Sequence, residues 1–185
     1  MIPLCERTVI AGKYRLEREL ASGGMGAVWV GRHLQLDAPV AVKFMSPTIP
    51  QLADARTRFA REARAAARVR GPHVVQVLDH GVDGDVPYIV MELLEGEHLG
   101  DRLKRERRLS LRAASAIATQ VGKALGRAHK AGIVHRDLKP ANVFLARLDD
   151  EEEVVKLLDF GIHKALSARG DDVTGTDVLM GSRST

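Results

Sequence analysis

Three glycines near the N-terminus could bring the backbone close to a ligand. Gly23, Gly24 and Gly26 follow Ala21 and Ser22, between two stretches that alternate apolar and polar residues. A glycine has no Cβ, so the chain can turn tightly there and a ligand can approach the backbone. A glycine-rich hairpin turn explains the cluster equally well when it is taken alone. Ala21 stands where a G-x-G-x-x-G pattern has its first glycine, which is tolerable only if Ala21 does not adopt a positive φ.

A lysine and a glutamate could form a second polar site. Lys43 ends the apolar stretch Val40-Ala41-Val42, and on its own it is most simply a strand-end lysine that reaches solvent. Glu62 alters this interpretation because it lies with Phe59 and Ala63 on the apolar face of a predicted helix, away from the arginines. A carboxylate directed into a lobe needs a cation, and Lys43 is a candidate.

Two later segments carry the strongest pattern. His135-Arg136-Asp137-Leu138-Lys139-Pro140-Ala141-Asn142 is followed, after two predicted strands, by Asp159-Phe160-Gly161. Together with the glycine cluster, Lys43 and Glu62, these segments resemble a protein kinase, and more narrowly the bacterial eukaryotic-like serine/threonine kinases. The resemblance implies an α+β fold with two lobes: a small antiparallel β-sheet lobe with one helix, and an incomplete, mainly helical large lobe.

The resemblance also implies how Mg-ATP would be bound. Gly23, Gly24 and Gly26 would cover the phosphates with backbone N–H groups. Lys43, held by Glu62, would bind the α- and β-phosphates. Phosphoryl transfer requires mainly positioning and charge neutralisation, which suits these residue types.

Catalytic and metal roles follow from the same resemblance. Asn142 and Asp159 would supply oxygen ligands for Mg²⁺. Asp137 would orient the substrate hydroxyl and accept its proton, while Lys139 would neutralise the transferred phosphoryl group. Lys139 in this motif also favours serine or threonine over tyrosine as the acceptor.

An adenine pocket is expected in the connection between the lobes, with Met91 at its back and hydrogen bonds from the backbone of residues 92–94. Ordinary core packing would explain the same apolar residues, and in this fold both can hold. The residues expected around the nucleotide here are Leu20, Val28, Ala41, Met91, Glu92, Leu94 and Phe144, with Lys43 at the phosphate end.

Regulation by phosphorylation is a further expectation. A phosphate on Thr174 or Thr176, added by autophosphorylation, could pair with Arg136 and order the segment after Asp159. A threonine in a flexible tail is more often simply solvated. Protein substrates with Ser/Thr hydroxyls are the expected partners.

Periodicity places these residues on expected strands and helices. A helix over 51–70 is predicted to end at Gly71-Pro72, and a second runs from the N-cap Ser110 to Ala131 with Gly132 after it. The second helix has an apolar stripe formed by Ala114, Ile117, Ala118, Val121, Leu125 and Ala128. Strands are predicted near 14–20, 27–33, 39–44, 74–78, 88–91, 143–145 and 154–157.

Composition excludes several other classes of protein. The chain has 185 residues, 28 basic against 24 acidic side chains, and one cysteine, Cys5, so neither an internal disulfide nor a thiolate zinc cluster is expected. No apolar run approaches the roughly 20 residues that span a bilayer, which favours a cytoplasmic protein. The arginines between 56 and 70 could form a nucleic-acid surface, but only Phe59 lies among them, so no nucleic-acid partner is expected.

The resemblance covers Tyr14 to about Gly181. We divide the chain into an N-terminal extension (1–13), a small lobe (14–95) and part of a large lobe (96–185), because an Ala-Pro-Glu-like element and the helices after it are missing. Two hypotheses remain. The chain is an ATP- and Mg²⁺-dependent serine/threonine kinase, or it is a truncated, non-catalytic nucleotide-binding or interaction fragment of one.

Overall fold

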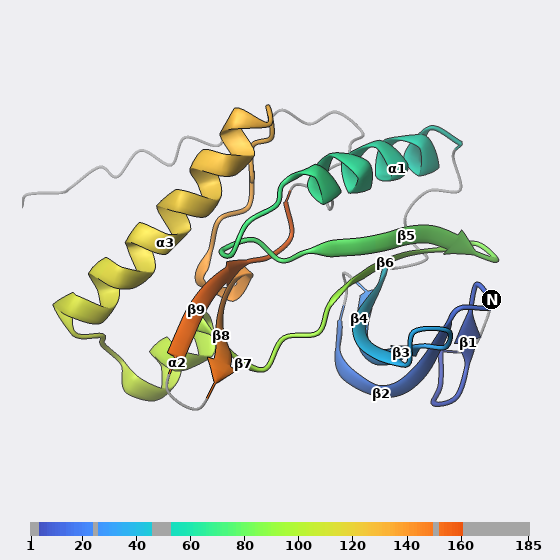
Figure 1. Cartoon of the computed structure of the whole chain (residues 1–185), viewed down its shortest axis with the longest axis horizontal. Coiled ribbons are helices and arrows are strands. Elements are labelled where there is room, and N and C mark those ends of the chain that lie inside the picture. The colour runs from blue at the N-terminus through green and yellow to red at the C-terminus, as the bar shows by residue number, and fades with distance from the viewer. Residues whose placement is uncertain (1–3, 24–25, 46–52, 150–151, 161–185) are drawn as a thin grey trace, which may run out of the picture.

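The computed structural model describes residues 4–23, 26–45, 53–149 and 152–160. A six-stranded antiparallel sheet at the N-terminal end has the order β1-β2-β3-β4-β6-β5, and its first four strands curl in Figure 1. Its strands are β1 (Val9–Ile10), β2 (Tyr14–Gly23), β3 (Gly26–His33), β4 (Ala38–Met45), β5 (Val77–Asp83) and β6 (Val86–Glu92). The strands predicted near 14–20, 27–33, 39–44 and 88–91 are therefore confirmed.

Alternating side chains of this sheet form an apolar cluster that we call the sheet core. On β4, for example, Val40, Val42 and Phe44 are buried in the sheet core. This spacing follows from the two-residue period of a strand. The sheet core comprises Ile10, Tyr14, Leu16, Trp29, Val40, Val42, Phe44, Val86, Tyr88 and Val90.

The N-terminal residues join this sheet. Val9 and Ile10 pair with Arg15 and Tyr14, and Ile10 is buried. The sequence gives no strand signal there, because a two-residue strand is too short to show a period.

The strand predicted at 74–78 lies later in the chain, at Val77–Asp83. Residues 73–75 instead run beside β9, where Val74 forms a parallel bridge with Leu157. A short apolar run does not indicate which neighbour it will pair with, so the boundary was misplaced.

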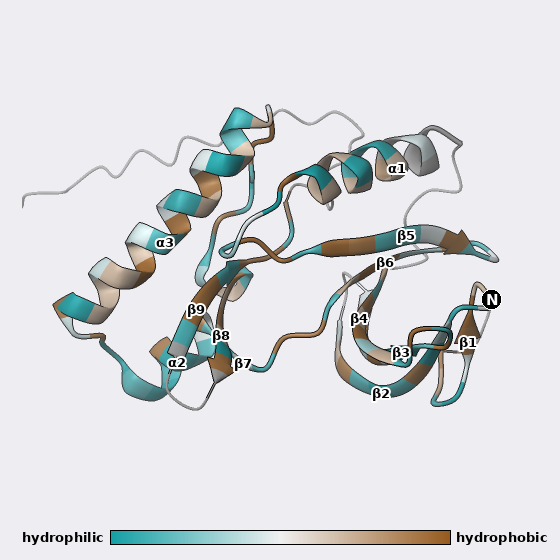
Figure 2. Cartoon of the chain, viewed as in Figure 1, coloured by the Kyte–Doolittle hydropathy of each residue, from teal (hydrophilic) through white to brown (hydrophobic). Residues whose placement is uncertain are grey.

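Helix α1 (Ala53–Arg68) lies beside β5 (Figure 1), within the predicted range 51–70. Phe59, Ala63 and Ala66 are buried, as the helical spacing predicts. Figure 2 shows hydrophilic residues alternating with more apolar ones along the coloured part of the helix. The helix ends before Gly71-Pro72, the expected stop signal.

Between Gly96 and Leu157 the described residues form two α-helices, one 3-10 turn and a three-stranded sheet of order β7-β8-β9. These elements are β7 (Gly96–His98), α2 (Leu99–Glu106), α3 (Leu111–Lys130), the 3-10 turn η1 (Pro140–Asn142), β8 (Val143–Asp149) and β9 (Glu152–Leu157). The strands predicted at 143–145 and 154–157 are confirmed. β7 and α2 were missed, because α2 has no buried residue and therefore no apolar stripe.

Helix α3 has the predicted boundaries. The Ser110 side chain accepts a hydrogen bond from the Ala113 N–H at 3.1 Å, and Gly132 has φ 73°, a conformation that suits glycine. Only part of the predicted stripe is covered: Ala124 and Ala128 are buried, whereas Ala114 and Ala118 are exposed.

A second cluster, the central core, joins the two ends of the molecule. Its residues come from β4, α1, the segment before β5, β6, α3, β8, β9 and the segment after β9. The buried members are Met45, Phe59, Ala66, Val69, Val74, Ile89, Ala124, Ala128, Val143, Leu145, Val155, Leu157 and Phe160. In the part of the chain that the structure describes, no helix is long and apolar enough to cross a membrane.

Candidate active site

A cleft of about 610 Å³ lies between the curled sheet and the β7-β8-β9 sheet. All the residues expected at an adenine pocket line it: Leu20, Val28, Ala41, Lys43, Met91, Glu92, Leu94 and Phe144. The lining also includes residues that the sequence did not single out, among them Val75, His98, Ala141, Arg147 and Leu158. Leu158 could have been found from its position directly before Asp159.

Gly23 ends β2 and Gly26 begins β3, and neither is among the residues that line the cleft. Gly26 has φ 122°, and a Cβ on it would collide with the Phe44 carbonyl oxygen, so glycine is required. A Cβ on Gly23 would meet nothing within 4 Å. Ala21 lines the cleft without a positive φ, so the substituted first position of the pattern is compatible with the fold. Gly24 lies outside the described residues.

Lys43 is positioned by β4, where it pairs in register with Val28 on one side and Ile89 on the other. Its Nζ lies 2.6 Å from Asp159 Oδ2, and the two side chains are 12% and 21% exposed. A cation with so little solvent needs a nearby anion. The pair therefore links the curled sheet to the segment that follows β9.

The Lys43–Glu62 pair implied by the resemblance is not formed between these described residues. Glu62 Oε1 instead lies 3.6 Å from a guanidinium nitrogen of Arg61, its neighbour on α1. The reason lies at Lys43, where the Asp159 carboxylate already supplies a close counter-charge. A carboxylate on an apolar helix face predicts that a cation is needed, but not which one.

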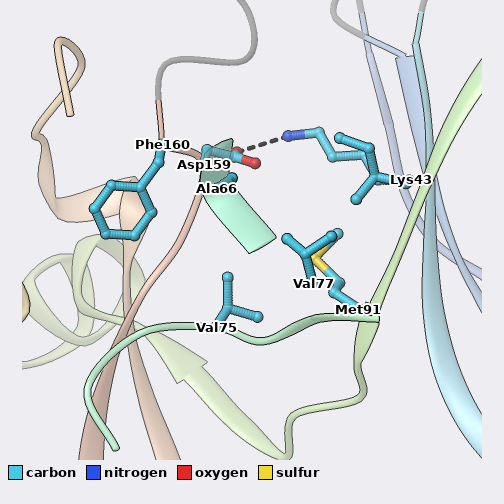
Figure 3. Close-up of a pocket in the computed structure, with 8 residues that line it drawn as sticks. Lys43, Ala66, Val75, Val77, Met91, Asp159 and Phe160 are labelled. Carbon is cyan, nitrogen blue, oxygen red and sulfur yellow. Dashed lines mark hydrogen bonds and ion pairs between the residues drawn. The ribbon is translucent and has the colours of Figure 1, made fainter. Parts of the chain in front are cut away.

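Figure 3 shows a smaller cavity of about 20 Å³ next to the Lys43–Asp159 pair. Met91, Val75, Val77, Ala66 and Phe160 line it together with the ion pair. Its volume is on the order of one water molecule. Met91 lines both the cleft and this cavity.

Asp137 is held by two neighbours in the loop before β8. Asn142 Nδ2 donates to the Asp137 carbonyl oxygen at 2.8 Å and to its Oδ2 at 3.0 Å. Lys139 Nζ lies 2.9 Å from the same Oδ2. The side-chain hydrogen bond from Lys139 is the largest cause that lowers the pKa of Asp137; burial opposes it, and the hydrogen bond from Asn142 lowers the pKa further. At neutral pH Asp137 is therefore a carboxylate and can accept a proton.

His135 is a positioning residue that was not singled out from the sequence beyond its place in the motif. It is 2% exposed; its Nε2 lies 2.7 Å from the Leu158 carbonyl oxygen, and the Asp137 N–H donates to its Nδ1 at 3.4 Å. These contacts fit a neutral ring with the proton on Nε2. The ring also packs against Phe160, with centroids 4.9 Å apart. His135 therefore connects the Asp137 loop with the Asp159 segment.

Two non-glycine residues of these segments have left-handed backbones, Arg136 with φ 62° and Asp159 with φ 55°. Such conformations cost free energy and persist where the surroundings enforce them. Here the Leu158 N–H donates to the Asn142 carbonyl at 2.9 Å. This hydrogen bond joins the loop that contains Arg136 to the segment that contains Asp159, and it helps to hold both in place. Gly161, Thr174 and Thr176 lie outside the described residues.

The oxygen donors suit a hard cation. Asn142 uses its amide nitrogen on Asp137, which leaves its side-chain oxygen without a hydrogen bond from the described residues. Asp159 adds a carboxylate. Within residues 4–160, gaps excepted, no three His, Cys, Asp or Glu side chains come together as a metal site. This donor set fits Mg²⁺, which binds few protein oxygens and keeps water and phosphate ligands.

Comparisons with known proteins agree with this geometry. A family model described as "Protein kinase domain" matches residues 14–183. Serine/threonine-protein kinase PknA of Mycobacterium tuberculosis is 42% identical over 178 residues, which are 94% of this chain and 40% of PknA. PknL of the same species is 38% identical over 96% of this chain and 43% of its own length.

Solved structures show the same fold. The crystal structure of the Mycobacterium tuberculosis PknI kinase domain has a TM-score of 0.76 and 33% identity, covering 86% of this chain and 62% of that domain. The chain thus spans about two fifths of the length of these curated relatives and less than two thirds of the solved domain. The expected α+β kinase-like fold is confirmed, and the chain belongs to the protein kinase family.

Proposed function

We propose that this chain carries the nucleotide site and the catalytic loop of an ATP-dependent serine/threonine kinase. The observation that supports this most is the pair of segments joined by His135: one presents the ionised Asp137, and the other presents Asp159 beside Lys43 in the cleft. We place the lobe boundary near residue 95, between β6 and β7.

In this proposal the adenine enters the apolar part of the cleft. Val28 and Ala41 come from the curled sheet, and Phe144 comes from β8, so the base would be covered on both faces. The backbone of residues 92–94 offers hydrogen bonds along the edge. The phosphates would then extend toward Lys43 and the backbone around Gly26.

Asn142 and Asp159 would hold Mg²⁺, which neutralises phosphate charge when bound. Lys43 would transfer its interaction from Asp159 to the phosphates, since a bound polyanion competes for its charge. Glu62, on α1, would then support Lys43, which is the role implied by the resemblance.

Asp137 would orient the hydroxyl of a protein serine or threonine and accept its proton as the oxygen bonds to the γ-phosphorus. The bond from that phosphorus to the bridging oxygen of ADP breaks in the same step. Lys139, 2.9 Å from Asp137, is close enough to neutralise charge on the transferred group. Asn142 keeps the Asp137 side chain aimed through its two hydrogen bonds.

The test is transfer of labelled phosphate from Mg-ATP to a generic basic protein by the purified chain. We expect transfer in the wild type and none above background in Lys43→Met or Asp137→Asn. Lys104→Met is the matched control for Lys43, because it breaks an exposed lysine–aspartate pair on α2 with a side chain 81% exposed. Binding of Mg-ATP, shown by a thermal shift, without transfer would instead support the non-catalytic nucleotide-binding fragment.

A further inference from the structure

The Glu92 side chain receives hydrogen bonds from two segments that are far apart in the sequence. Lys156 Nζ donates to Glu92 Oε1 at 2.7 Å, and the Gln76 N–H donates to the same oxygen at 2.8 Å. The Glu92 N–H in turn donates to the Gln76 carbonyl at 3.0 Å. Glu92 ends β6 and begins the connection between the lobes, so the contacts fix that connection at its start.

The segment before β5 completes this arrangement. The Leu157 N–H donates to the His73 carbonyl at 2.9 Å, and the Val75 N–H donates to the Leu157 carbonyl at 3.1 Å. Residues 73–76 thus bond to β9 on one side and to Glu92 on the other. The Lys156 side chain, on β9, reaches Glu92 directly.

Burial distinguishes this ion pair from most others in the described structure. The Lys156 side chain is 12% exposed and that of Glu92 is 29% exposed, whereas Lys104 and Asp101 are 81% and 57% exposed. A poorly hydrated lysine that loses its carboxylate leaves an uncompensated charge, so the pair strongly favours one relative position of its two segments.

Both ends of the pair lead directly to the cleft. Glu92, Leu93 and Leu94 line the cleft on one side. Lys156 is followed by Leu157 and then by Leu158 and Asp159, which also line the cleft. A shift of β9 relative to the connection would therefore change the distance between the adenine edge and the Asp159 carboxylate.

We propose that Lys156 is a positioning residue of the nucleotide site: it holds the connection 92–94 in register with the strand that leads to Asp159. This inference rests on the kinase function proposed above. In this proposal the Lys156–Glu92 pair positions both the adenine-binding connection and Asp159. Loss of the pair should therefore weaken adenine binding, although adenine does not contact Lys156.

The test compares Lys156→Met, Lys156→Arg and the control Lys104→Met by two measurements. Hydrogen exchange of the Glu92 amide reports the connection directly, because that N–H bonds to Gln76. The dissociation constant of adenosine, which has no phosphates, reports the adenine site without Mg²⁺. In Lys156→Met we expect exchange at Glu92 to be about tenfold faster and adenosine to bind about tenfold more weakly, the order expected for one lost charge-assisted hydrogen bond.

Lys156→Arg should restore both values to within about threefold of the wild type, and Lys104→Met should leave them unchanged. A Lys156→Met chain that melts at a lower temperature yet keeps wild-type exchange at Glu92 and wild-type adenosine binding would overturn the proposal. If Lys156→Met does not fold, Glu92→Gln is the second variant, because it removes the charge of Glu92 and keeps the size of the side chain. It should change hydrogen exchange at residue 92 and adenosine binding in the same direction as expected for Lys156→Met. A wild type that binds no adenosine would contradict the kinase function, while exchange at Glu92 would still decide the role of Lys156.

Discussion

The sheet core and the central core are built from different kinds of segment. The sheet core takes its buried residues from neighbouring strands of one antiparallel sheet, between Ile10 and Val90. The central core collects residues from β4, α1, β6, α3, β8 and β9, and it extends to Phe160. The first core forms from the hairpins between β1 and β4 and one longer connection from β4 to β6, whereas the second gathers segments from Met45 to Phe160.

The cleft lies where these two regions meet, and its polar groups depend on both. Lys43 belongs to the curled sheet, while Asp159 and Asp137 are held by hydrogen bonds around His135 and Asn142. Apolar side chains line the part of the cleft proposed for adenine, and polar contacts around Asn142 hold Asp137, which does not line the cleft. Substitutions at Asp137 should therefore separate phosphate transfer from nucleotide binding.

The largest difference between the effects on phosphate transfer and on nucleotide binding is expected for Asp137→Asn. The variant keeps the size of the side chain but removes the proposed proton acceptor, so transfer should fall by about 10²–10⁴-fold. Binding of Mg-ATP should stay within about twofold of the wild type, because Asp137 does not line the cleft. Single-turnover transfer and nucleotide titration are the two measurements, and equal losses in both would show that the two sides are not separable.

A substitution in the curled sheet should instead lower stability and weaken nucleotide binding. Gly26→Ala places a Cβ against the Phe44 carbonyl at φ 122°, which should lower the free energy of unfolding by about 1–3 kcal/mol and weaken nucleotide binding. Gly23→Ala is the matched control, since its Cβ would meet no atom within 4 Å. Urea denaturation measures the free energy of unfolding of both variants. If Gly26→Ala is as stable as Gly23→Ala, β2 and β3 adjust freely to the added Cβ.

The difference between apolar packing and polar contacts also explains which elements the sequence could predict. Strands β2, β3 and β4 and helices α1 and α3 were predicted because each has an apolar period and a clear turn or cap. β1, β7 and α2 were missed. α2 is attached by ion pairs of Arg102 with Glu97 and Glu153, both at 2.5 Å, and such contacts leave no periodic signal.

For the candidate site, motif resemblance located the residues but not all of their partners. Every predicted adenine-pocket residue lines the cleft, because strand register fixes which side chains share a face. The partner of Lys43 was expected to be Glu62 and is Asp159 in the structure. Ion-pair choice depends on distances between segments that meet only in the folded chain, as does the contact between Glu92 and Lys156.

Alkaline pH should weaken the sheet core selectively. Burial, followed by the hydrogen bond to Asp79 Oδ2 at 2.8 Å and the charge of Asp79, raises the pKa of Tyr14 well above its ordinary value of about 10. Below pH 10 the phenol is neutral in both states. Above it the unfolded chain releases the proton first, so the free energy of unfolding should fall by up to about 1.4 kcal/mol per pH unit.

Tyr14→Phe isolates this effect, because it keeps the ring and removes the titrating group. The difference in unfolding free energy between wild type and variant should shrink as the pH rises from 9 to 11. Tyr88, whose pKa burial also raises, remains in both proteins and cancels. A pH-independent difference would mean that Tyr14 titrates alike in the folded and unfolded chains.

The smallest effect is expected at the N-cap of α3. Ser110→Ala removes the hydrogen bond to the Ala113 N–H and should cost about 1 kcal/mol. Thr119→Ala is the control, because the exposed Thr119 hydroxyl only bonds back to Ser115 on the same helix.

Trp29, the single tryptophan, is 5% exposed in the sheet core, so its fluorescence follows that core while far-UV circular dichroism at 222 nm follows the helices. Because the sheet core contains no residue of α3, we expect Ser110→Ala to shift the helical transition and leave the Trp29 transition in place. Equal shifts in both signals would show instead that the central core couples the two regions into one unfolding unit.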